Sequence, residues 1–231
     1  MPKMLDGMGK RLRWHVPNAI QPPDEAHSAD REGCTFLYMN SIKPFRHPEL
    51  CLEAFLRMCT KMGLDNKSNI KLLIVGMSSS VSSPATRRKE EKLRQMIKGC
   101  NVPVELHSWT NDPAAFFREA NVFLLPSDIV YVNYALLEAM GRGLPVIVQN
   151  AEGVEQLVES GLEGYVEEKD VDAWEKAMTK LAESSELRAA MGKAARERII
   201  ASFSYERYVE RYARIYDYIM GESGKCPPEN S

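Results

Sequence analysis

Six short apolar runs alternate with longer amphipathic stretches from Thr35 onward, and this alternation leaves few folds open to the chain. The runs are Thr35–Met39, Ile70–Gly76, Val102–Trp109, Val122–Pro126, Pro145–Gln149 and, more weakly, Gly164–Glu167. Several of them are apolar throughout, which is typical of parallel strands that are covered on both faces. The runs therefore predict the strands of one parallel sheet.

The stretches between the runs carry the period and the end signals of helices. In the first, Leu52, Phe55 and Met58 share one face, Pro48 stands at a first helical position and Gly63 provides the stop. The predicted helices are Pro48–Met62, Pro84 to about Lys98, Asn111–Ala120, Asn133–Met140, Gly153–Ser160, Asp170 to about Glu183, Ser184 to about Ile200, and Ser204–Met220. Strands that alternate with helices predict βαβ units in a doubly wound α/β fold.

The distribution of Gly and Pro divides the chain into four parts. Residues 1–32 are interrupted by Gly and Pro and are predicted to form a connector, with one short strand at Arg11–Val16. Residues 33–202 are predicted to form a single domain, 203–221 a final helix, and 222–231 a disordered tail.

Charge and hydropathy exclude several classes of protein. The 30 Lys and Arg residues against 32 Asp and Glu residues give a net charge of −2, a balance that predicts no binding to nucleic acid or to an anionic membrane. No apolar run approaches the ~20 residues of a membrane-spanning helix, and the N-terminus lacks the apolar region of a secretory signal. We therefore expect neither a membrane span nor secretion.

The cysteines and histidines argue against disulfides and metals. Five cysteines are an odd number, and no pair of them has C-x-x-C spacing, so the sequence predicts free thiols in the reducing cytoplasm. The four histidines lack metal-ligand spacing. Asp170 and Asp172 match a D-x-D metal motif, but they directly precede a helical period, which favours helix capping. No metal site is predicted.

The common nucleotide fingerprints are absent from the sequence. There is no G-x-G-x-x-G, no G-x-x-x-x-G-K-[ST] and no G-x-S-x-G, which excludes an ordinary dinucleotide site, a P-loop and a hydrolase elbow. Open α/β sheets bind ligands outside the carboxyl ends of their strands, so the turns that follow the strands are the candidate positions for a site.

The turn after the fourth run has features of an anion site. The run ends at Pro126-Ser127 and Asn133 opens a helix, so backbone amides near Asn133, Tyr134 and Ala135 are predicted to face a diphosphate. One turn further on, the Glu138 carboxylate could accept two hydrogen bonds from a ribose diol. From the residues alone, a solvated helix carboxylate is the favoured interpretation of Glu138.

A longer ordered pattern changes that interpretation. Pro126-Ser127, followed by Leu136-Leu-Glu-Ala-Met140, Gly143 and Pro145-Val-Ile147, resembles the donor-binding half of the large retaining glycosyltransferase family with the GT-B fold (glycosyl transferases group 1). The resemblance extends over residues 16 to 220. It implies a Rossmann-like domain that binds a nucleotide-diphosphate sugar without a metal, and it implies that Glu138 is the ribose ligand.

The same resemblance assigns the remaining candidate residues of the donor site. It places Ser41 and Arg46 where the family has a phosphate-gripping arginine and lysine, with Lys43 as a possible replacement for the lost arginine. The third predicted turn of the site is His107–Thr110, which includes Trp109.

One position departs from the family pattern. Val130 stands where the family has a glutamate that contacts the donor sugar, and Asp128 is the nearest acidic substitute. A valine cannot accept a hydrogen bond from a hydroxyl group, so the sugar end of the site is predicted to differ from that of the family.

Two functions remain open at this point. The first is a glycosyltransferase that is incomplete as a lone chain. It would bind a nucleotide sugar as its substrate, need no cofactor, and transfer the sugar to an acceptor held by another domain. The second is a degenerate donor domain that acts as a binding or scaffolding module. Both predict a partner domain, or self-association, through the aromatic helix Ser204–Met220. No acceptor-side catalytic residue is assigned, and we expect the chain alone to show no robust sugar transfer.

Overall fold

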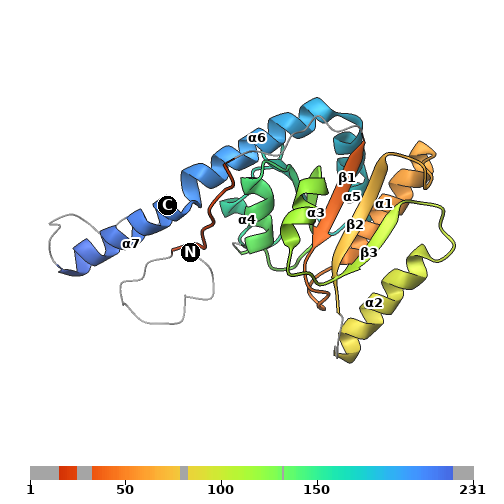
Figure 1. Cartoon of the computed structure of the whole chain (residues 1–231), viewed down its shortest axis with the longest axis horizontal. Helices are drawn as coiled ribbons and strands as arrows, with labels where there is room; N and C mark the ends of the chain where they lie inside the picture. Colours follow the sequence, from red (N-terminus) through yellow and green to blue (C-terminus); the bar gives the residue numbers. More distant parts are fainter. Residues whose placement is uncertain (1–15, 25–32, 79–82, 132, 221–231) are drawn as a thin grey trace.

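Six parallel strands form one sheet in the computed structural model of the chain, which describes residues 16–24, 33–78, 83–131 and 133–220 (Figure 1). The strands are β1 (Cys34–Met39), β2 (Ile70–Met77), β3 (Val104–Ser108), β4 (Val122–Leu125), β5 (Val146–Gln149) and β6 (Gly164–Glu167). Their order in the sheet is β3-β2-β1-β4-β5-β6, and every neighbouring pair is parallel. This order is that of a doubly wound sheet, so the predicted fold class is confirmed.

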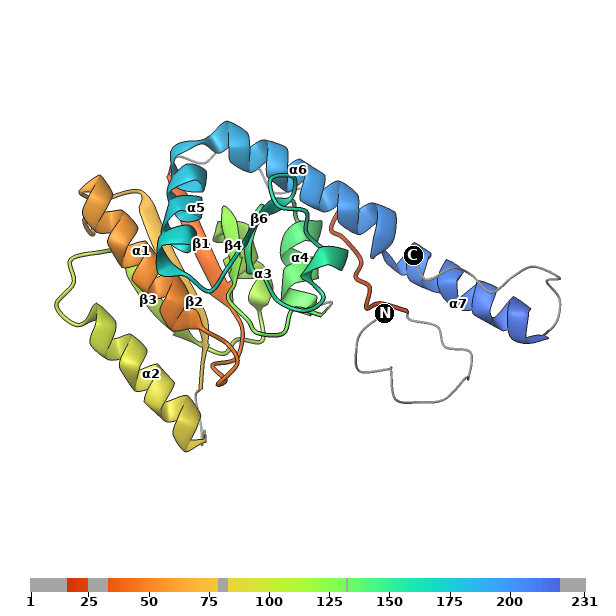
Figure 2. The same cartoon turned by 180° about the vertical axis from the view of Figure 1, so that it is seen from behind.

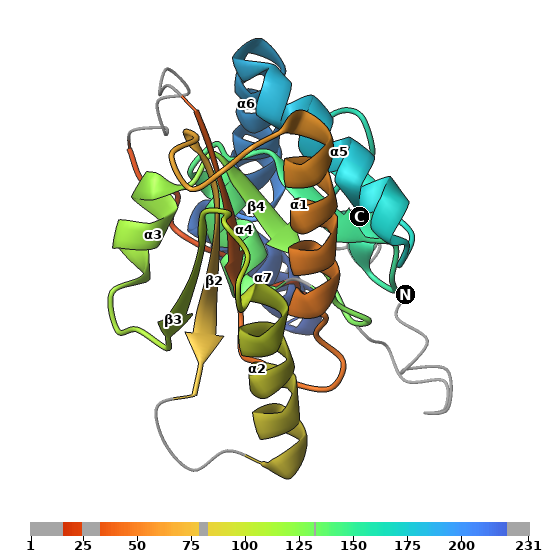
Figure 3. The ribbon, with the colours of Figure 1, turned by 90° about the vertical axis from the view of Figure 1, so that its right-hand side faces the viewer.

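Helices cover both faces of the sheet. They are α1 (Pro48–Met62), α2 (Pro84–Ile97), α3 (Pro113–Glu119), α4 (Tyr134–Gly141), α5 (Val171–Glu183), α6 (Ser185–Ser202) and α7 (Tyr205–Met220). Helices α1, α2 and α5 lie on one face, and α3 and α4 on the other (Figures 2 and 3). Because both faces are covered, the carboxyl edge of the sheet is the place where polar side chains can gather.

The alternation of side chains along β1 produces two separate cores. Phe36 and Tyr38 point into the core beneath α1 and α5, while Leu37 points into the core beneath α3 and α4. All three are fully buried. A strand that is buried on both faces must be apolar at every position, which is why the short runs in the sequence read as parallel strands.

Helix α1 shows how local signals set the ends of an element. Pro48 occupies the first turn, where its missing N–H leaves no carbonyl unpaired. Gly63 ends the helix with φ 65°, and its N–H donates to the carbonyls of Cys59 and Thr60. The observed bounds are the predicted ones.

The predicted helix Gly153–Ser160 is wrong. Only one 3-10 turn forms there, at Val154–Gln156. The amide of Glu159 donates to the Glu163 carboxylate at 2.7 Å, which replaces the bond that would continue a helix. The chain then turns into β6, beginning with a bridge between Ser160 and Gly164.

The end of the chain extends away from the sheet. Helix α6 crosses the molecule, and α7 continues beyond it with none of its residues buried (Figures 1 and 2). The early segment 16–24 lies against their junction, where the Ile20 amide donates to the Phe203 carbonyl at 3.0 Å. The predicted strand Arg11–Val16, except for Val16, and the predicted tail lie outside the described residues.

Candidate functional site

Three loops at the carboxyl edge of the sheet are joined through their backbones. The His47 amide donates to the Pro126 carbonyl at 2.8 Å, and the Asp128 amide donates to the Phe45 carbonyl at 3.0 Å. A bridge between Ile129 and Glu152 adds the loop that follows β5. The loops after β1, β4 and β5 therefore form one connected surface.

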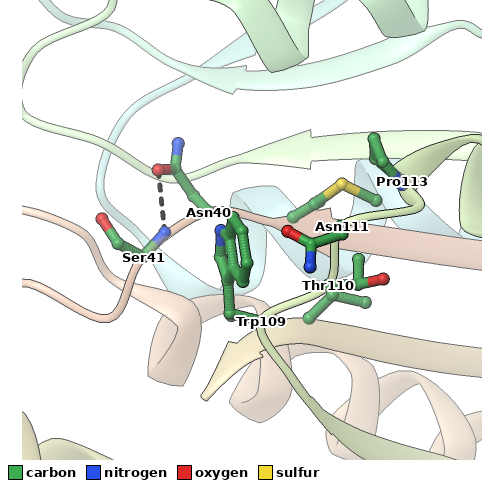
Figure 4. A pocket seen from close by; sticks show the side chains of 9 residues that line it. Asn40, Ser41, Trp109, Thr110, Asn111 and Pro113 are labelled. Atoms are coloured by element: carbon green, nitrogen blue, oxygen red, sulfur yellow. Dashed lines mark hydrogen bonds between the residues drawn. The ribbon is translucent and has the colours of Figure 1, made fainter. Parts of the chain in front are cut away.

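A pocket of about 500 Å³ opens over the ends of β1, β2 and β3 (Figure 4). Its lining residues are Met39, Asn40, Ser41, Val75, Gly76, Trp109, Thr110, Asn111 and Pro113. The Trp109 ring lies beside Asn40 and is 65% exposed. The Asn40 side-chain oxygen accepts a hydrogen bond from the Ser41 amide at 2.9 Å. An exposed indole next to amide and hydroxyl groups suits a flat, polar ring such as a nucleobase.

The guanidinium of Arg46 forms no ion pair with any described residue. Two of its guanidinium nitrogens, Nε and Nη1, are enclosed without a hydrogen-bond partner. Burial lowers the pKa of Arg46, while the nearby Tyr38 phenol opposes that shift. The group lies 5.3 Å from the centre of the Phe45 ring. An enclosed guanidinium without an acceptor is a group that a bound anion would stabilise.

Helix α4 begins on the same connected surface. Asn133 caps it, and the Asn133 side chain accepts a hydrogen bond from the Leu136 amide at 3.3 Å. Tyr134 is 56% exposed, whereas Ala135 packs against the core. The first amides of a helix have no carbonyl partner within the helix, so this end can receive an anion.

Glu138 is half-buried on the second turn of α4. Its carboxylate lies 3.8 Å from Arg142 Nη1, an ion pair across one helical turn. Arg142 also stacks 4.9 Å from the centre of the Phe117 ring. The Glu138 side chain remains 35% exposed, which leaves its carboxylate able to accept further hydrogen bonds.

Two candidate residues lie away from these groups. Lys43 is exposed and does not line the pocket, and its backbone carbonyl accepts a hydrogen bond from the Arg46 amide at 3.0 Å. The side chain of Val130 is only 1% exposed and belongs to the core beneath α3 and α4. The residue as a whole is buried, so neither its side chain nor its backbone is presented to a donor.

Asp128 lies in a cluster of charged and polar side chains that the sequence did not reveal. Its carboxylate contacts His47 Nε2 at 2.8 Å, Gln149 Nε2 at 3.0 Å and Lys169 Nζ at 3.5 Å. Lys169 Nζ also lies 2.8 Å from His47 Nε2. Burial alone would raise the pKa of Asp128, but the hydrogen bonds from Gln149 and His47 and the positive charge of Lys169 outweigh it and lower the pKa to about 2.

One signal in the sequence could have indicated this cluster. Asp128, Gln149 and Lys169 stand at or just after the ends of three adjacent parallel strands, β4, β5 and β6. The carboxyl ends of such strands meet at one edge. The contribution of His47 depends on its own side-chain direction, which no motif encodes.

The acidic pair Asp170 and Asp172 has a structural role, as predicted. The Asp170 carboxylate accepts a hydrogen bond from the Ala173 amide at 2.9 Å and so caps α5. Asp172 pairs with Arg57 of α1 at 2.5 Å. Across the described ranges of the chain, no group of three or more His, Cys, Asp or Glu side chains is arranged to hold a metal ion. The described helices also include none that is long and apolar enough to cross a bilayer.

Comparisons with known proteins find relatives of this chain. The family described as Glycosyl transferases group 1 matches residues 23–198. The chain is 28% identical over 156 residues to the capsular polysaccharide biosynthesis glycosyltransferase CapM of Staphylococcus aureus, a match that covers 67% of this chain and 40% of CapM.

Solved structures share the fold. A mutant of S. aureus TarM, in complex with fondaparinux, alpha-GlcNAc-glycerol and UDP, superposes with a TM-score of 0.69 at 20% identity, covering 88% of this chain and 38% of TarM. Anabaena HepE, in complex with UDP and glucose, gives a TM-score of 0.68 at 15% identity, covering 80% of this chain and 48% of HepE. The chain thus spans less than half the length of each of these three proteins.

Proposed function

The chain belongs to the group 1 family of glycosyl transferases, and from this premise we propose that it binds a nucleotide-diphosphate sugar for transfer to an acceptor. The acceptor would be held by another domain, either of the same polypeptide or of a partner. The observation that carries the proposal is the enclosed, unpartnered guanidinium of Arg46, in a loop that is hydrogen-bonded to the segment leading into α4. The UDP bound in the TarM and HepE structures supports a nucleotide ligand.

In the proposed complex each part of the donor meets a different element. The base lies in the pocket against Trp109, the ribose diol donates to Glu138, and the diphosphate lies between Arg46 and the first amides of α4. As the bond to the sugar breaks, negative charge grows on the diphosphate. We propose that Arg46 and the helix amides stabilise that charge in place of a metal. From the family resemblance we also propose that the transfer is retaining.

The proposed partner surface is the exposed stripe along α7. Five large side chains lie on it at spacings of four, three, four and three residues, namely Tyr205, Val209, Tyr212, Tyr216 and Ile219, and each is at least 37% exposed. That spacing keeps an apolar seam on one side of a helix. We propose that an acceptor domain or a second copy of the chain covers it. We place the protein in the cytoplasm, where the four described cysteines, which are unpaired, would stay reduced.

A non-catalytic role is the second candidate. It is favoured by the burial of Val130 and by the contacts that occupy Asp128, since neither residue is presented to a sugar in the manner of the family's glutamate. Calorimetric titration with a panel of nucleoside diphosphates and their sugars separates the candidates. Tight binding of a nucleotide sugar supports the donor role, and the absence of any nucleotide binding supports the scaffolding role.

Glu138→Ala tests the ribose contact directly. Loss of a charge-assisted hydrogen bond is expected to weaken binding of the nucleoside diphosphate by ~1.5–3 kcal/mol, roughly tenfold to a hundredfold. Glu197→Ala is the matched control, because Glu197 also forms an ion pair across one helical turn, with Lys193 at 3.9 Å. Equal affinities for the wild-type protein and a folded Glu138→Ala variant would remove the ribose role.

A further inference from the structure

Helix α2 concentrates positive charge on its outer side. Residues 84–100 hold six of the 30 Lys and Arg residues but only two of the 32 Asp and Glu residues, so this segment carries +4 while the rest of the chain carries −6. Five of the six cations are exposed, four of them within the helix and Lys98 at its C-cap; we call them the basic face: Arg87, Arg88, Lys92, Arg94 and Lys98. The net charge of −2 for the whole chain conceals this uneven distribution of charge.

The cations of the basic face have no side-chain partners within the described part of the protein. Among the ion pairs and side-chain hydrogen bonds of the described residues, none involves any of the five. The acidic residue on the exposed arc of α2, Glu91, accepts its hydrogen bond from Gln95 at 3.1 Å. The fold uses the opposite side of α2 instead, where Leu93 is buried and Glu90 accepts hydrogen bonds from the amide and hydroxyl of Ser78 at 2.7 and 2.6 Å.

The basic face opposes helix formation. Arg88 and Lys92 are like charges one helical turn apart, which destabilises a helix. The first turn of α2 contains no acidic residue, and Arg87 and Arg88 stand near the positive end of the helix dipole. The cations in the first half of α2 therefore destabilise the isolated helix, whereas an anionic partner would relieve both unfavourable interactions.

We propose that the basic face docks the protein on an anionic lipid surface. A cluster of four or more Lys and Arg residues on one side of an amphipathic helix is suited to acidic headgroups. Single-stranded nucleic acid is less well matched, because the exposed arc of α2 carries no aromatic side chain on which bases could stack. This inference does not depend on the proposed sugar transfer.

The position of α2 would bring a bound lipid surface near the pocket. The helix begins just after β2, at the carboxyl edge where the pocket opens, and it projects past the ends of β2 and β3 (Figures 1 and 3). A lipid surface held along α2 would therefore lie close to the edge that carries the pocket.

Vesicle co-sedimentation tests the proposal. The full chain is mixed with phosphatidylcholine vesicles with and without phosphatidylserine, and polyuridine is used as a nucleic-acid probe. We expect binding only to the vesicles that contain phosphatidylserine, and we expect added salt to weaken it. The variant Arg87→Gln/Arg88→Gln/Lys92→Gln should bind at least tenfold more weakly.

Two further variants separate charge from folding. Lys176→Gln/Lys193→Gln/Arg207→Gln removes three exposed cations from other helices and should bind like the wild-type protein. Arg87→Lys/Arg88→Lys/Lys92→Arg keeps the charge and should also retain binding. No binding to anionic vesicles, equal binding by the glutamine variant of the basic face, or tighter binding to polyuridine than to vesicles would each overturn the proposal.

Discussion

The two halves of the carboxyl edge share one topology but present different surfaces. The open half, over β1 to β3, contains the pocket with Asn40, Ser41 and Trp109. The bridged half, over β4 to β6, is closed by contacts among His47, Asp128, Gln149 and Lys169.

The difference follows from the residues that end the strands. In the open half, the loops leave a hollow beside an indole that is 65% exposed. In the bridged half, side chains from the loop after β1, the end of β5 and the loop after β6 reach one carboxylate. The same sheet edge can thus provide a binding surface at one end and a rigid support at the other. Base and phosphate recognition would then lie toward the open half and around α4, and the bridged half would fix the loops beside them.

The largest expected effect, on stability, is that of Val130→Glu, which puts the family's sugar-contacting glutamate into the bridged half. Because the Val130 side chain is buried in the core, Val130→Glu should destabilise the protein by about 3–5 kcal/mol, as other uncompensated buried charges do. Chemical denaturation measures the loss. Val209→Glu is the control, because Val209 is 63% exposed on α7 and its replacement should change stability by no more than ~0.5 kcal/mol. A stable Val130→Glu variant that binds nucleotide sugar more tightly would show that the two halves are equally open.

The fold could be predicted because its signals are local. Proline and glycine mark both ends of α1, and strands buried on both faces must be apolar. The failure at Gly153–Ser160 has a different cause, since the Glu163 carboxylate captures an amide that a helix would need. Sequence patterns describe backbone preference, and a side chain four residues away overrode that preference.

Some residues of the candidate site could also be predicted from the sequence, and others could not. The family resemblance indicated Ser41 and the end of a strand indicated Trp109, and the structure brings both to one pocket. The contact of His47 with Asp128 joins residues 81 positions apart and depends on two side-chain directions. The inward orientation of Val130 was equally hidden, because a loop has no period from which to read the buried side. Side-chain direction in loops is the part that the sequence did not disclose.

A smaller effect, on binding only, is expected in the open half. Trp109→Ala should weaken binding of a nucleoside diphosphate by ~1–3 kcal/mol, the usual contribution of one base stacked on an aromatic ring. Stability should hardly change, because the side chain is largely exposed. Tyr216→Ala is the matched control, because this aromatic residue is 61% exposed and belongs to α7, the helix that extends away from the sheet (Figure 1). If the two variants bind nucleotide equally well, the base does not lie in the open half.

The smallest effect is expected from Asp128→Asn, which removes the charge at the centre of the bridged half. The Asp128 side chain is 45% exposed, so solvent screens its ion pairs and the loss at neutral pH should be about 0.5–1 kcal/mol. The sign of the pH dependence follows from the pKa of about 2, which is below the ordinary value of about 3.9 for an unfolded chain. A lowered pKa stabilises the folded state above about pH 4, and that contribution is lost as the pH falls toward 2.

Denaturation of the wild-type protein and of Asp128→Asn across that pH range measures the contribution. The difference in the free energy of unfolding should shrink as the pH falls from about 4 to about 2. Lys169→Gln, alone and combined with Asp128→Asn, completes a double-mutant cycle. Because Lys169 contacts both Asp128 and His47, the two losses should not add. Additive losses without pH dependence would mean that these residues only lie near one another, and the bridged half would then be as free to bind a ligand as the open half.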